Sequence, residues 1–450
     1  MKRRLLIGLS LIIILGFPLW GGYFLFFTPR GVPWILKGVS WFSPLTLTAE
    51  KWEGRLAGSL RLEGLQARWK DGHLRIQSYQ SRLNPKQMLL GKILFEEIKV
   101  IGVTFDRLRK RTEPLDLSWP RLSGLLTLLN IEVRSFEVKD LFYRTPDNPA
   151  YHLQEISGRL AWKQGILALT QLSFKNDLGR LEGNLGLGFR TPALKIDLKW
   201  SAERPWQGME QFLFRGRLGP DWRGMPLTGP VQIRGLREGK ERFLFQSELG
   251  ITPHRINIRQ IELKEVGRKG SLSGEGAVLL DRIDPAFQVD LNLNNLDFSK
   301  EVRAPLILSG QLNLEGRPAA YSGTFDLKNK RLSWQAAFLT GGLKGNGTGV
   351  ALEIQKGQWL KGSLQGRLQI DWEKGLSLRG AIQGRGLQTE VLDPRLPGLI
   401  NIEARGELIP TSSGLNQGSL TLNLPQSRFQ GKSLTGLVKA RLAHGALLID

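Results

Sequence analysis

A regular alternation of apolar and polar residues is the feature that most constrains the fold of this chain. It is clearest in residues 362–386, where one set of alternate positions is apolar and the other is polar. The apolar set comprises Leu364, Leu368, Ile370, Trp372, Leu376 and Leu378. Successive side chains of a β-strand point to opposite faces, so this segment predicts a β-hairpin with one apolar and one polar face.

The same alternation recurs along most of the chain. Leu60 and Leu62 share one face of an early segment, and a later segment carries Phe287, Val289, Leu291 and Leu293 at alternate positions. The 53 glycines and 22 prolines suit strands and turns better than helices. Gly-x-Leu phrases recur at uneven intervals, so no repeat of fixed length is present. The sequence therefore predicts an all-β fold built from many one-sided strands.

The N-terminus predicts a membrane anchor. Lys2, Arg3 and Arg4 precede an uncharged run from Leu5 to Phe27, which would extend about 35 Å as a helix and would cross a bilayer. The basic residues in front of it predict a cytoplasmic N-terminus, with the rest of the chain on the far side. A cleaved signal peptide is the alternative, but its apolar region is usually shorter and no small-residue cleavage motif follows here. We therefore expect an uncleaved single-pass anchor.

Five parts are expected along the chain. Residues 1–30 form the basic tip and the anchor, and residues 31–110 form a membrane-proximal module of strands and helix. In that module residues 31–42 predict either a short amphipathic helix, lying on the membrane or capping the first strand, or an irregular apolar linker. Residues 111–205 and 231–450 form two β-segments, and the proline-rich residues 206–230 form an irregular junction between them.

No pattern in the sequence points to catalysis, so we expect neither an enzyme nor a bound cofactor or metal. The chain has no cysteine, and its four histidines are far apart without a second metal ligand at suitable spacing. The glycine-rich residues 345–349 lack the strand–loop–helix context of a phosphate-binding loop. The net charge of +22 favours anionic partners or a well-solvated basic surface. A body outside the cytoplasm argues against nucleic acid as the partner.

The apolar faces of these strands must be buried away from water by another element or by a ligand. A second sheet would give a sandwich, whereas an elongated, curled, antiparallel-rich sheet would form a β-trough whose apolar interior holds lipid acyl chains. The anchor, the long succession of one-sided strands and the basic exterior favour the trough. Its candidate lining residues are Leu60, Leu62, Phe287, Val289, Leu291, Leu293, Leu364, Leu368, Ile370, Trp372, Leu376 and Leu378.

The sequence also resembles a known family. Similar phrases are W-x-G-R-L-A-G-S-L-R-L-E-G-L from Trp52, IQSYQSRLNPKQMLLGKILFEEIKVIGVTF from Ile76 and LDPRLPGLINIEARGEL from Leu392. Together with the basic and apolar N-terminus, they resemble the AsmA-like group and, within it, the TamB type. The latter is the inner-membrane subunit of the translocation and assembly module of bacteria with two membranes.

This resemblance implies a periplasmic bridge that conducts phospholipids from the inner membrane toward the outer membrane and so supports outer-membrane biogenesis. An alternative role that it implies is a scaffold for the assembly or secretion of outer-membrane β-barrel proteins and autotransporters, with an Omp85-type barrel as partner. TamB-type relatives are longer and have a C-terminal domain that nothing here matches. We therefore expect an N-terminal portion or a short relative.

Overall fold

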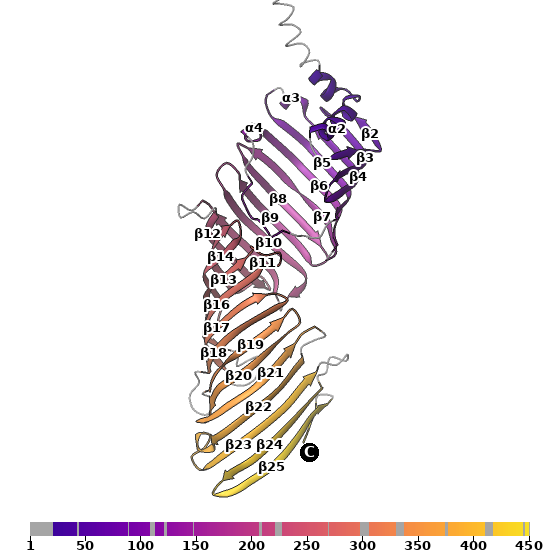
Figure 1. Ribbon diagram of the computed structural model, residues 1–450. Coiled ribbons are helices and arrows are strands. Elements are labelled where there is room, and N and C mark those ends of the chain that lie inside the picture. Colours follow the sequence, from indigo (N-terminus) through magenta and orange to yellow (C-terminus); the bar gives the residue numbers. More distant parts are fainter. Residues whose placement is uncertain are drawn as a thin grey trace, which may run out of the picture. The chain divides into compact units, whose positions relative to one another are not determined.

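The structure is a computed structural model that describes residues 21–42, 45–88, 90–108, 113–120, 124–146, 148–206, 209–220, 227–268, 270–297, 306–329, 337–373, 377–409, 417–443 and 446–449. These residues fold into two compact units (Figure 1). Unit 1 comprises residues Met1–Thr112 and Ser118–Glu241, and unit 2 comprises Glu113–Leu117 and Arg242–Asp450. Each unit is described separately below.

The described part of unit 1 contains a sheet and the short helices α2, α3 and α4. Residues 21–27 are helical as well and precede the first of the three helices. The elements are α2 (Gly31–Phe42), β1 (Thr46–Thr48), β2 (Lys51–Gly54), β3 (Ser59–Trp69), β4 (Gly72–Leu83), α3 (Pro85–Met88), β5 (Ile93–Arg107), α4 (Gly124–Leu128), β6 (Asn130–Thr145), β7 (Asn148–Lys163), β8 (Ile166–Asn176), β9 (Gly179–Gly188), β10 (Ala193–Trp206), β11 (Met209–Leu218) and β12 (Leu227–Arg237).

The strands of unit 1 pair in sequence order. β1 and β2 both pair with β3, and from β3 to β12 each strand pairs with the next. All these pairs are antiparallel except β5 and β6, which run parallel, with Val100 opposite Val138. A parallel pair needs a crossover connection, and the segment that contains α4 provides it.

Unit 2 is a regular meander of antiparallel strands. Its elements are β13 (Lys240–Thr252, whose first two residues belong to unit 1), β14 (Arg255–Glu265), β15 (Ser271–Leu279), β16 (Ala286–Asp297), β17 (Ile307–Arg317), β18 (Ala320–Asn329), β19 (Ala337–Asn346), β20 (Gly349–Trp359), β21 (Gly362–Asp371), β22 (Ser377–Gln388), η2 (Thr389–Val391), β23 (Gly398–Ile409), β24 (Gln417–Phe429), β25 (Lys432–Ala443) and β26 (Ala446–Ile449). Each strand pairs with the next, and no described pairing joins β13 to β26, so this sheet is open.

β-Bulges recur in the strands of both units. At the bulges of β8, β14 and β16 the extra residue is Gln171, Gln260 or Asn295, each with a φ of 52°. The next strand satisfies the freed backbone N–H in two of these bulges: Gln171 donates to Asn184 Oδ1 over 3.1 Å, and Asn295 donates to the Ser309 hydroxyl over 2.9 Å. Because a bulge bends its strand and increases the local twist, this recurrence curves the sheet.

The only cluster of fully buried apolar residues in the described structure lies where α2 packs on β3. Val32 of α2 is 3% exposed, and Leu60 and Leu62 of β3 are each 5% exposed. Leu36 and Tyr79 pack around them. The helix predicted for residues 31–42 therefore forms, and it caps the apolar face of the first long strand.

The all-β, mostly antiparallel fold is confirmed. Residues 206–230, expected as an irregular junction, contain β11 and the start of β12, and the two compact units divide between Glu241 and Arg242. Among the described residues no helix is both long enough and apolar enough to cross a bilayer. Most of the predicted anchor, including Lys2, Arg3 and Arg4, lies in residues 1–20, outside the described residues.

Candidate functional site

The strand register of unit 2 aligns apolar residues into continuous rows. Three rows run across the strands from β16 to β25 and a fourth runs from β16 to β23, and every member is apolar or glycine. The rows are Phe287, Gly316, Tyr321, Gly345, Val350, Ile370, Leu378, Leu408, Gly418 and Leu442; Val289, Leu314, Gly323, Leu343, Leu352, Leu368, Gly380, Gly406, Leu420 and Ala440; Leu291, Leu312, Phe325, Gly341, Ile354, Gly366, Ile382, Ala404, Leu422 and Val438; and Leu293, Gly310, Leu327, Leu339, Gly357, Leu364, Gly384 and Ile402. We call this surface the apolar face of unit 2.

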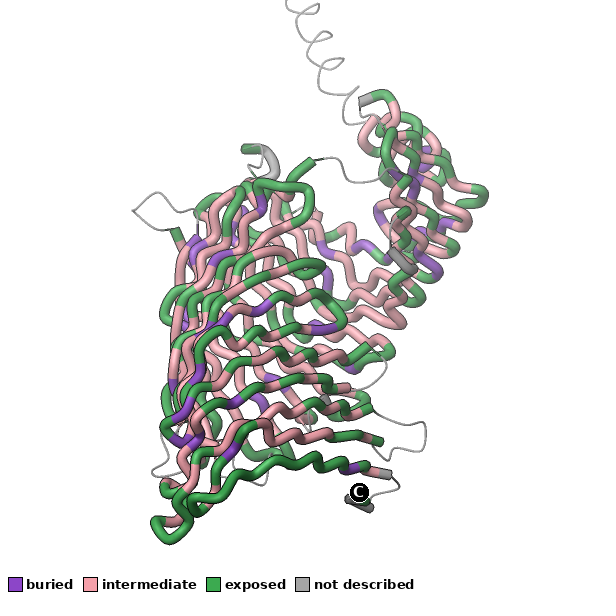
Figure 2. Tube along the Cα trace, turned by 60° about the horizontal axis from the view of Figure 1, so that its bottom comes forward, coloured by how far each residue is buried: buried purple, intermediate pink, exposed green. Residues whose placement is uncertain are grey.

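Glycines in these rows make room for the large side chains beside them. A Cβ atom at Gly380 would lie 2.8 Å from Leu368 Cδ1, and one at Gly384 would lie 2.9 Å from Ile402 Cγ1. The large residues therefore lean across the glycines of the neighbouring strand, which removes part of their surface from water without a second layer. Most of the large residues on the apolar face are half-buried, whereas the polar residues between them are mostly exposed (Figure 2).

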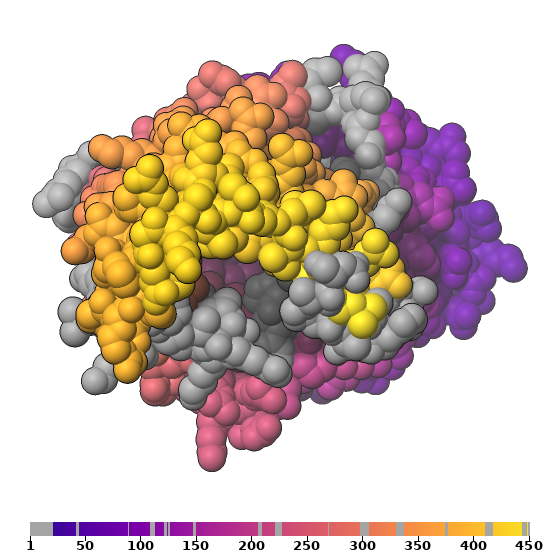
Figure 3. Space-filling model, turned by 90° about the horizontal axis from the view of Figure 1, so that it is seen from below, coloured from indigo at the N-terminus to yellow at the C-terminus, as the bar shows by residue number. Residues whose placement is uncertain are grey.

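No second layer packs on the apolar face within the described residues of unit 2. Each strand has extensive contacts only with the strands before and after it in the chain. A sandwich would instead bring together strands that are distant in sequence. Viewed along the stack of strands, the C-terminal strands curve around a hollow (Figure 3). The described part of unit 2 is thus a single curved layer with one apolar and one polar face.

A similar row crosses the sheet of unit 1. It begins at Leu62, beneath α2, and continues through Tyr79, Val100, Val138, Ile156, Phe174, Leu181, Trp200 and Phe212. Aromatic residues are frequent at its far end, where the rings of Trp200 and Phe212 stack with centroids 5.2 Å apart. The apolar alternation therefore runs through both units, and among the described residues a helix covers only its beginning, at β3.

The predicted lining residues have four different outcomes. Those of β16, β21 and β22 lie in the rows of unit 2: Phe287, Val289, Leu291, Leu293, Leu364, Leu368, Ile370 and Leu378. Leu60 and Leu62 are covered by α2, so they belong to the core and not to an open surface. Trp372 follows the end of β21 and donates its indole N–H to the carbonyl of Gly347 over 3.0 Å. Leu376 lies outside the described residues.

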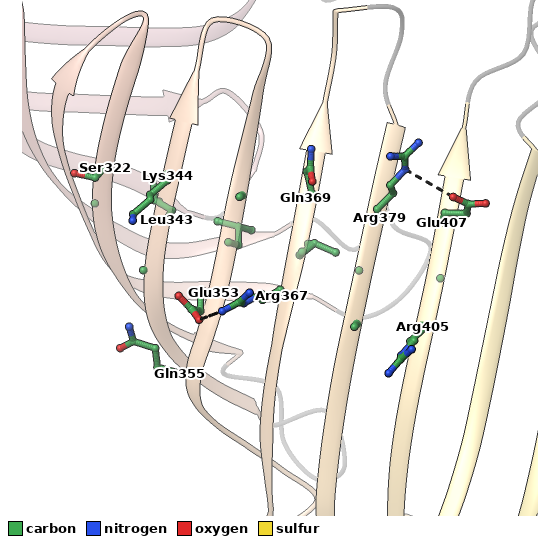
Figure 4. Close-up of a pocket in the computed structure, with 18 of the residues that line it drawn as sticks. Ser322, Leu343, Lys344, Glu353, Gln355, Arg367, Gln369, Arg379, Arg405 and Glu407 are labelled. Atoms are coloured by element: carbon green, nitrogen blue, oxygen red, sulfur yellow. Dashed lines mark hydrogen bonds and ion pairs between the residues drawn. The ribbon is translucent and has the colours of Figure 1, made fainter.

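The polar face of unit 2 carries a groove of about 1040 Å³ that the sequence analysis missed (Figure 4). Small residues make its floor, and long charged residues of neighbouring strands make its walls. Floor and walls include Gly342, Ala351, Ala381, Lys344, Glu353, Arg367, Arg379, Arg405 and Glu407. Because small residues on a polar face leave no mark in the apolar alternation, only their coincidence on adjacent strands could have indicated this groove.

Opposite charges in this groove are largely paired. Arg367 Nη2 lies 2.9 Å from Glu353 Oε1, and Arg379 Nε lies 3.7 Å from Glu407 Oε2. Exposed pairs of this kind contribute little to stability and keep a surface soluble. The groove therefore has the character of a solvated face, in contrast to the apolar face behind it.

One carboxyl group of unit 2 has a clearly shifted pKa. Asp393 lies in the connection between η2 and β23, and its Oδ2 is 2.8 Å from Arg395 Nη2. This side-chain hydrogen bond and a second one from the Arg395 backbone N–H hold the pKa of Asp393 below its ordinary value. The pair fixes the connection locally and lies at the ends of the strands, away from the apolar rows.

Comparisons of the chain with models of known protein families, with curated proteins and with solved structures find no match. The resemblance described above therefore stays a prediction from the sequence. The functional argument depends on the geometry of the apolar face.

Proposed function

We propose that this protein binds phospholipid acyl chains on the apolar face of unit 2 and conducts phospholipids along the sheet. The observation that carries the proposal is the set of uninterrupted apolar rows, three across ten strands and a fourth across eight, without a covering layer among the described residues. Large apolar surfaces exposed on a soluble body are unusual and mark binding sites. A lipid would remove this surface from water at a gain of roughly 0.8 kcal/mol per buried CH₂ group.

The apolar face is large enough to bind lipid acyl chains. With strands about 4.8 Å apart, ten strands extend over roughly 40 Å, and four alternate positions along a strand extend over about 20 Å. One leaflet of hydrocarbon is about 15 Å thick, so several acyl chains fit side by side on such a surface. No described side chain within the rows carries a charge that would interrupt their movement.

The net charge and the predicted N-terminal anchor suggest where in the cell the proposed lipid binding would take place. A net charge of +22 would attract anionic headgroups to the protein, while the acyl chains occupy the apolar face. The predicted anchor would put the start of the chain in a membrane and the sheet on its far side, which by the resemblance would be the inner membrane and the periplasm. In this proposal the protein is a non-enzymatic conduit toward the outer membrane, and the direction of transport comes from elsewhere.

A pair of adjacent substitutions tests conduction. Leu368→Asp puts an unpaired charge on the apolar face, whereas Gln369→Asp puts the same charge on the polar face of the same strand. Because burying an unpaired charge against hydrocarbon is costly, we expect Leu368→Asp to abolish phospholipid delivery to the outer membrane in a deletion strain. Gln369→Asp should restore delivery to the level of the unmodified chain.

Two results would contradict the proposal. If Leu368→Asp folds, as judged by circular dichroism, and still delivers phospholipid, the apolar face is not the path. If both variants deliver phospholipid but lose the insertion of outer-membrane β-barrel proteins, the scaffold alternative replaces the conduit. In that case exposed strand edges should crosslink to client proteins, since strand addition works through backbone hydrogen bonds.

A further inference from the structure

Helix α2 exposes two tryptophans on the side opposite its contact with the sheet. Trp34 is 57% exposed and Trp41 is 72% exposed. They are seven residues apart, which is two helical turns, so both point the same way at a separation of about 10 Å. Lys37 lies between them and is exposed as well. Large aromatic side chains in this arrangement, with a basic residue beside them, are typical of helices at a membrane surface.

The opposite side of α2 is fixed to the sheet, so the tryptophans cannot turn inward. Val32 is buried against Leu60 and Leu62. The Ser40 hydroxyl accepts a hydrogen bond from the backbone N–H of Leu47 over 3.1 Å. These contacts hold both ends of α2 against the sheet and keep Trp34 and Trp41 facing outward.

The segment in front of α2 also exposes aromatic side chains. Residues 21–27 are helical, and Tyr23 and Phe26 are 60% and 40% exposed. The carbonyl oxygen of Phe26 accepts a hydrogen bond from the backbone N–H of Ala57 over 2.7 Å, which ties this segment to the connection between β2 and β3. These residues end the uncharged run from Leu5 to Phe27, whose length suits a bilayer. The exposed tryptophans therefore follow directly after the predicted anchor.

We propose that α2 lies in the headgroup layer of the bilayer, with Trp34 and Trp41 inserted between the lipids and Lys37 reaching their phosphates. The tryptophan ring suits this layer because its body is apolar and its N–H is polar. Lysine at such a position keeps its charged end in water or on anionic lipid. One side of α2 would then close the apolar face of β3 while the other side holds unit 1 against the membrane.

This inference rests on the proposed attachment to a membrane but not on lipid binding by unit 2. Because the chain contains no cysteine, a single spin label can be attached without removing native residues of that type. Gly38→Cys places the label on the outward side, between the tryptophans, where nothing lies within 4 Å of a Cβ atom. Lys70→Cys, in the exposed turn between β3 and β4, is the matched control in unit 1.

The full chain, reconstituted in vesicles of phosphatidylcholine and phosphatidylglycerol, is then tested with oxygen and a nickel chelate as relaxation agents. We expect the label at position 38 to be accessible to oxygen but shielded from nickel, at a depth of about 5–10 Å into the boundary between headgroups and acyl chains. The label at position 70 should be accessible to nickel. Adding Trp34→Ser and Trp41→Ser to Gly38→Cys should return its label to the aqueous phase.

Three results would overturn the inference. Nickel access at position 38 equal to that at position 70 would place α2 in water. Shielding from both agents would mean that protein, such as a second copy of the chain, covers this side. An unchanged depth without the two tryptophans would mean that they do not hold the helix. Leu368→Asp should leave the label at position 38 in place, so failed conduction and failed docking are seen separately.

Discussion

The two ends of the described chain use the same alternation for different purposes. In unit 1, Leu62 of β3 is 5% exposed because α2 packs on it. In unit 2, Leu368 of β21 occupies an equivalent position in an alternating strand but is only half-buried, and nothing described covers it. The difference is not in the strands themselves. It depends on whether another element of the chain lies over the apolar face.

The comparison shows how a single layer tolerates an open apolar face. In the described part of unit 1 a short helix covers the first strands only, whereas in the rows of unit 2 large residues lean over glycines. Leaning reduces the exposed area but leaves a surface that hydrocarbon can still cover. The same alternation therefore gives a core beneath α2 and a candidate lipid path in unit 2.

The largest expected effect is on the stability of unit 1, where α2 covers the apolar face of β3. Leu62→Ala should destabilise unit 1 by about 2–5 kcal/mol, since it leaves a cavity in its buried cluster. Leu368→Ala should cost clearly less, because its side chain is already partly in contact with water. Hydrogen exchange of the amides of β3 and β21 measures the two effects locally. Equal losses would mean that the apolar face of unit 2 is as well covered as the cluster beneath α2.

The next largest effect is expected from replacing a glycine of the apolar rows, which should lower the stability of unit 2. At Gly341 a Cβ atom would collide with the carbonyl oxygen of Glu353 and lie 2.8 Å from Phe325 Cζ. Gly341→Ala should therefore destabilise unit 2 by roughly 1–3 kcal/mol, measured by urea denaturation. Gly436→Ala in β25 is the control, because a Cβ atom there meets nothing within 4 Å. If both variants lose the same stability, steric crowding in the rows is not the reason for these glycines.

A smaller effect is expected from mild acid, which should lower the stability of unit 1 through His73. His73 of β4 is buried, and burial together with Arg75 and Arg68 lowers its pKa below the ordinary value of 6.5. As the pH falls, His73 therefore takes up a proton in the unfolded chain at a higher pH than in the folded chain. The stability of unit 1 should consequently fall as the pH drops through about 6.5. His73→Gln should flatten this dependence in exchange measurements between about pH 7 and pH 5. An unchanged pH dependence in that variant would assign the effect to other groups.

The smallest effect is expected on the polar face. Arg367 and Glu353 form an ion pair whose side chains are 81% and 53% exposed. Glu353→Gln should change the free energy of unfolding by less than about 1 kcal/mol and leave lipid binding intact. A larger change in either quantity would show that the polar groove does more than keep the sheet soluble.

The sequence predicted the strands and their faces well, because alternation is a local pattern. The hairpin of β21 and β22 forms as expected, with Leu364 and Leu368 on one face and Gln365 and Gln369 on the other. The cap formed by α2 was one of two alternatives, because helical spacing does not say which surface a short helix will meet.

Other features depend on pairing between strands and could not be read from local patterns. The parallel pairing of β5 with β6 spans a connection that contains α4. The bulges at Gln171, Gln260 and Asn295 become visible only when opposite strands are aligned. Likewise, the match of Leu368 with Gly380, which lets the side chain lean, is a property of the register.

The central claim is that lipid covers the apolar face of unit 2 and not its polar face. The most direct test places a photo-crosslinking amino acid at Leu364 and, in a second variant, at the adjacent Gln365, and identifies the products by mass spectrometry. We expect phospholipid adducts at position 364, whose residue lies in an apolar row, and none at position 365, whose residue is exposed on the opposite face. Adducts with protein alone at position 364, or equal lipid labelling at both positions, would contradict the account.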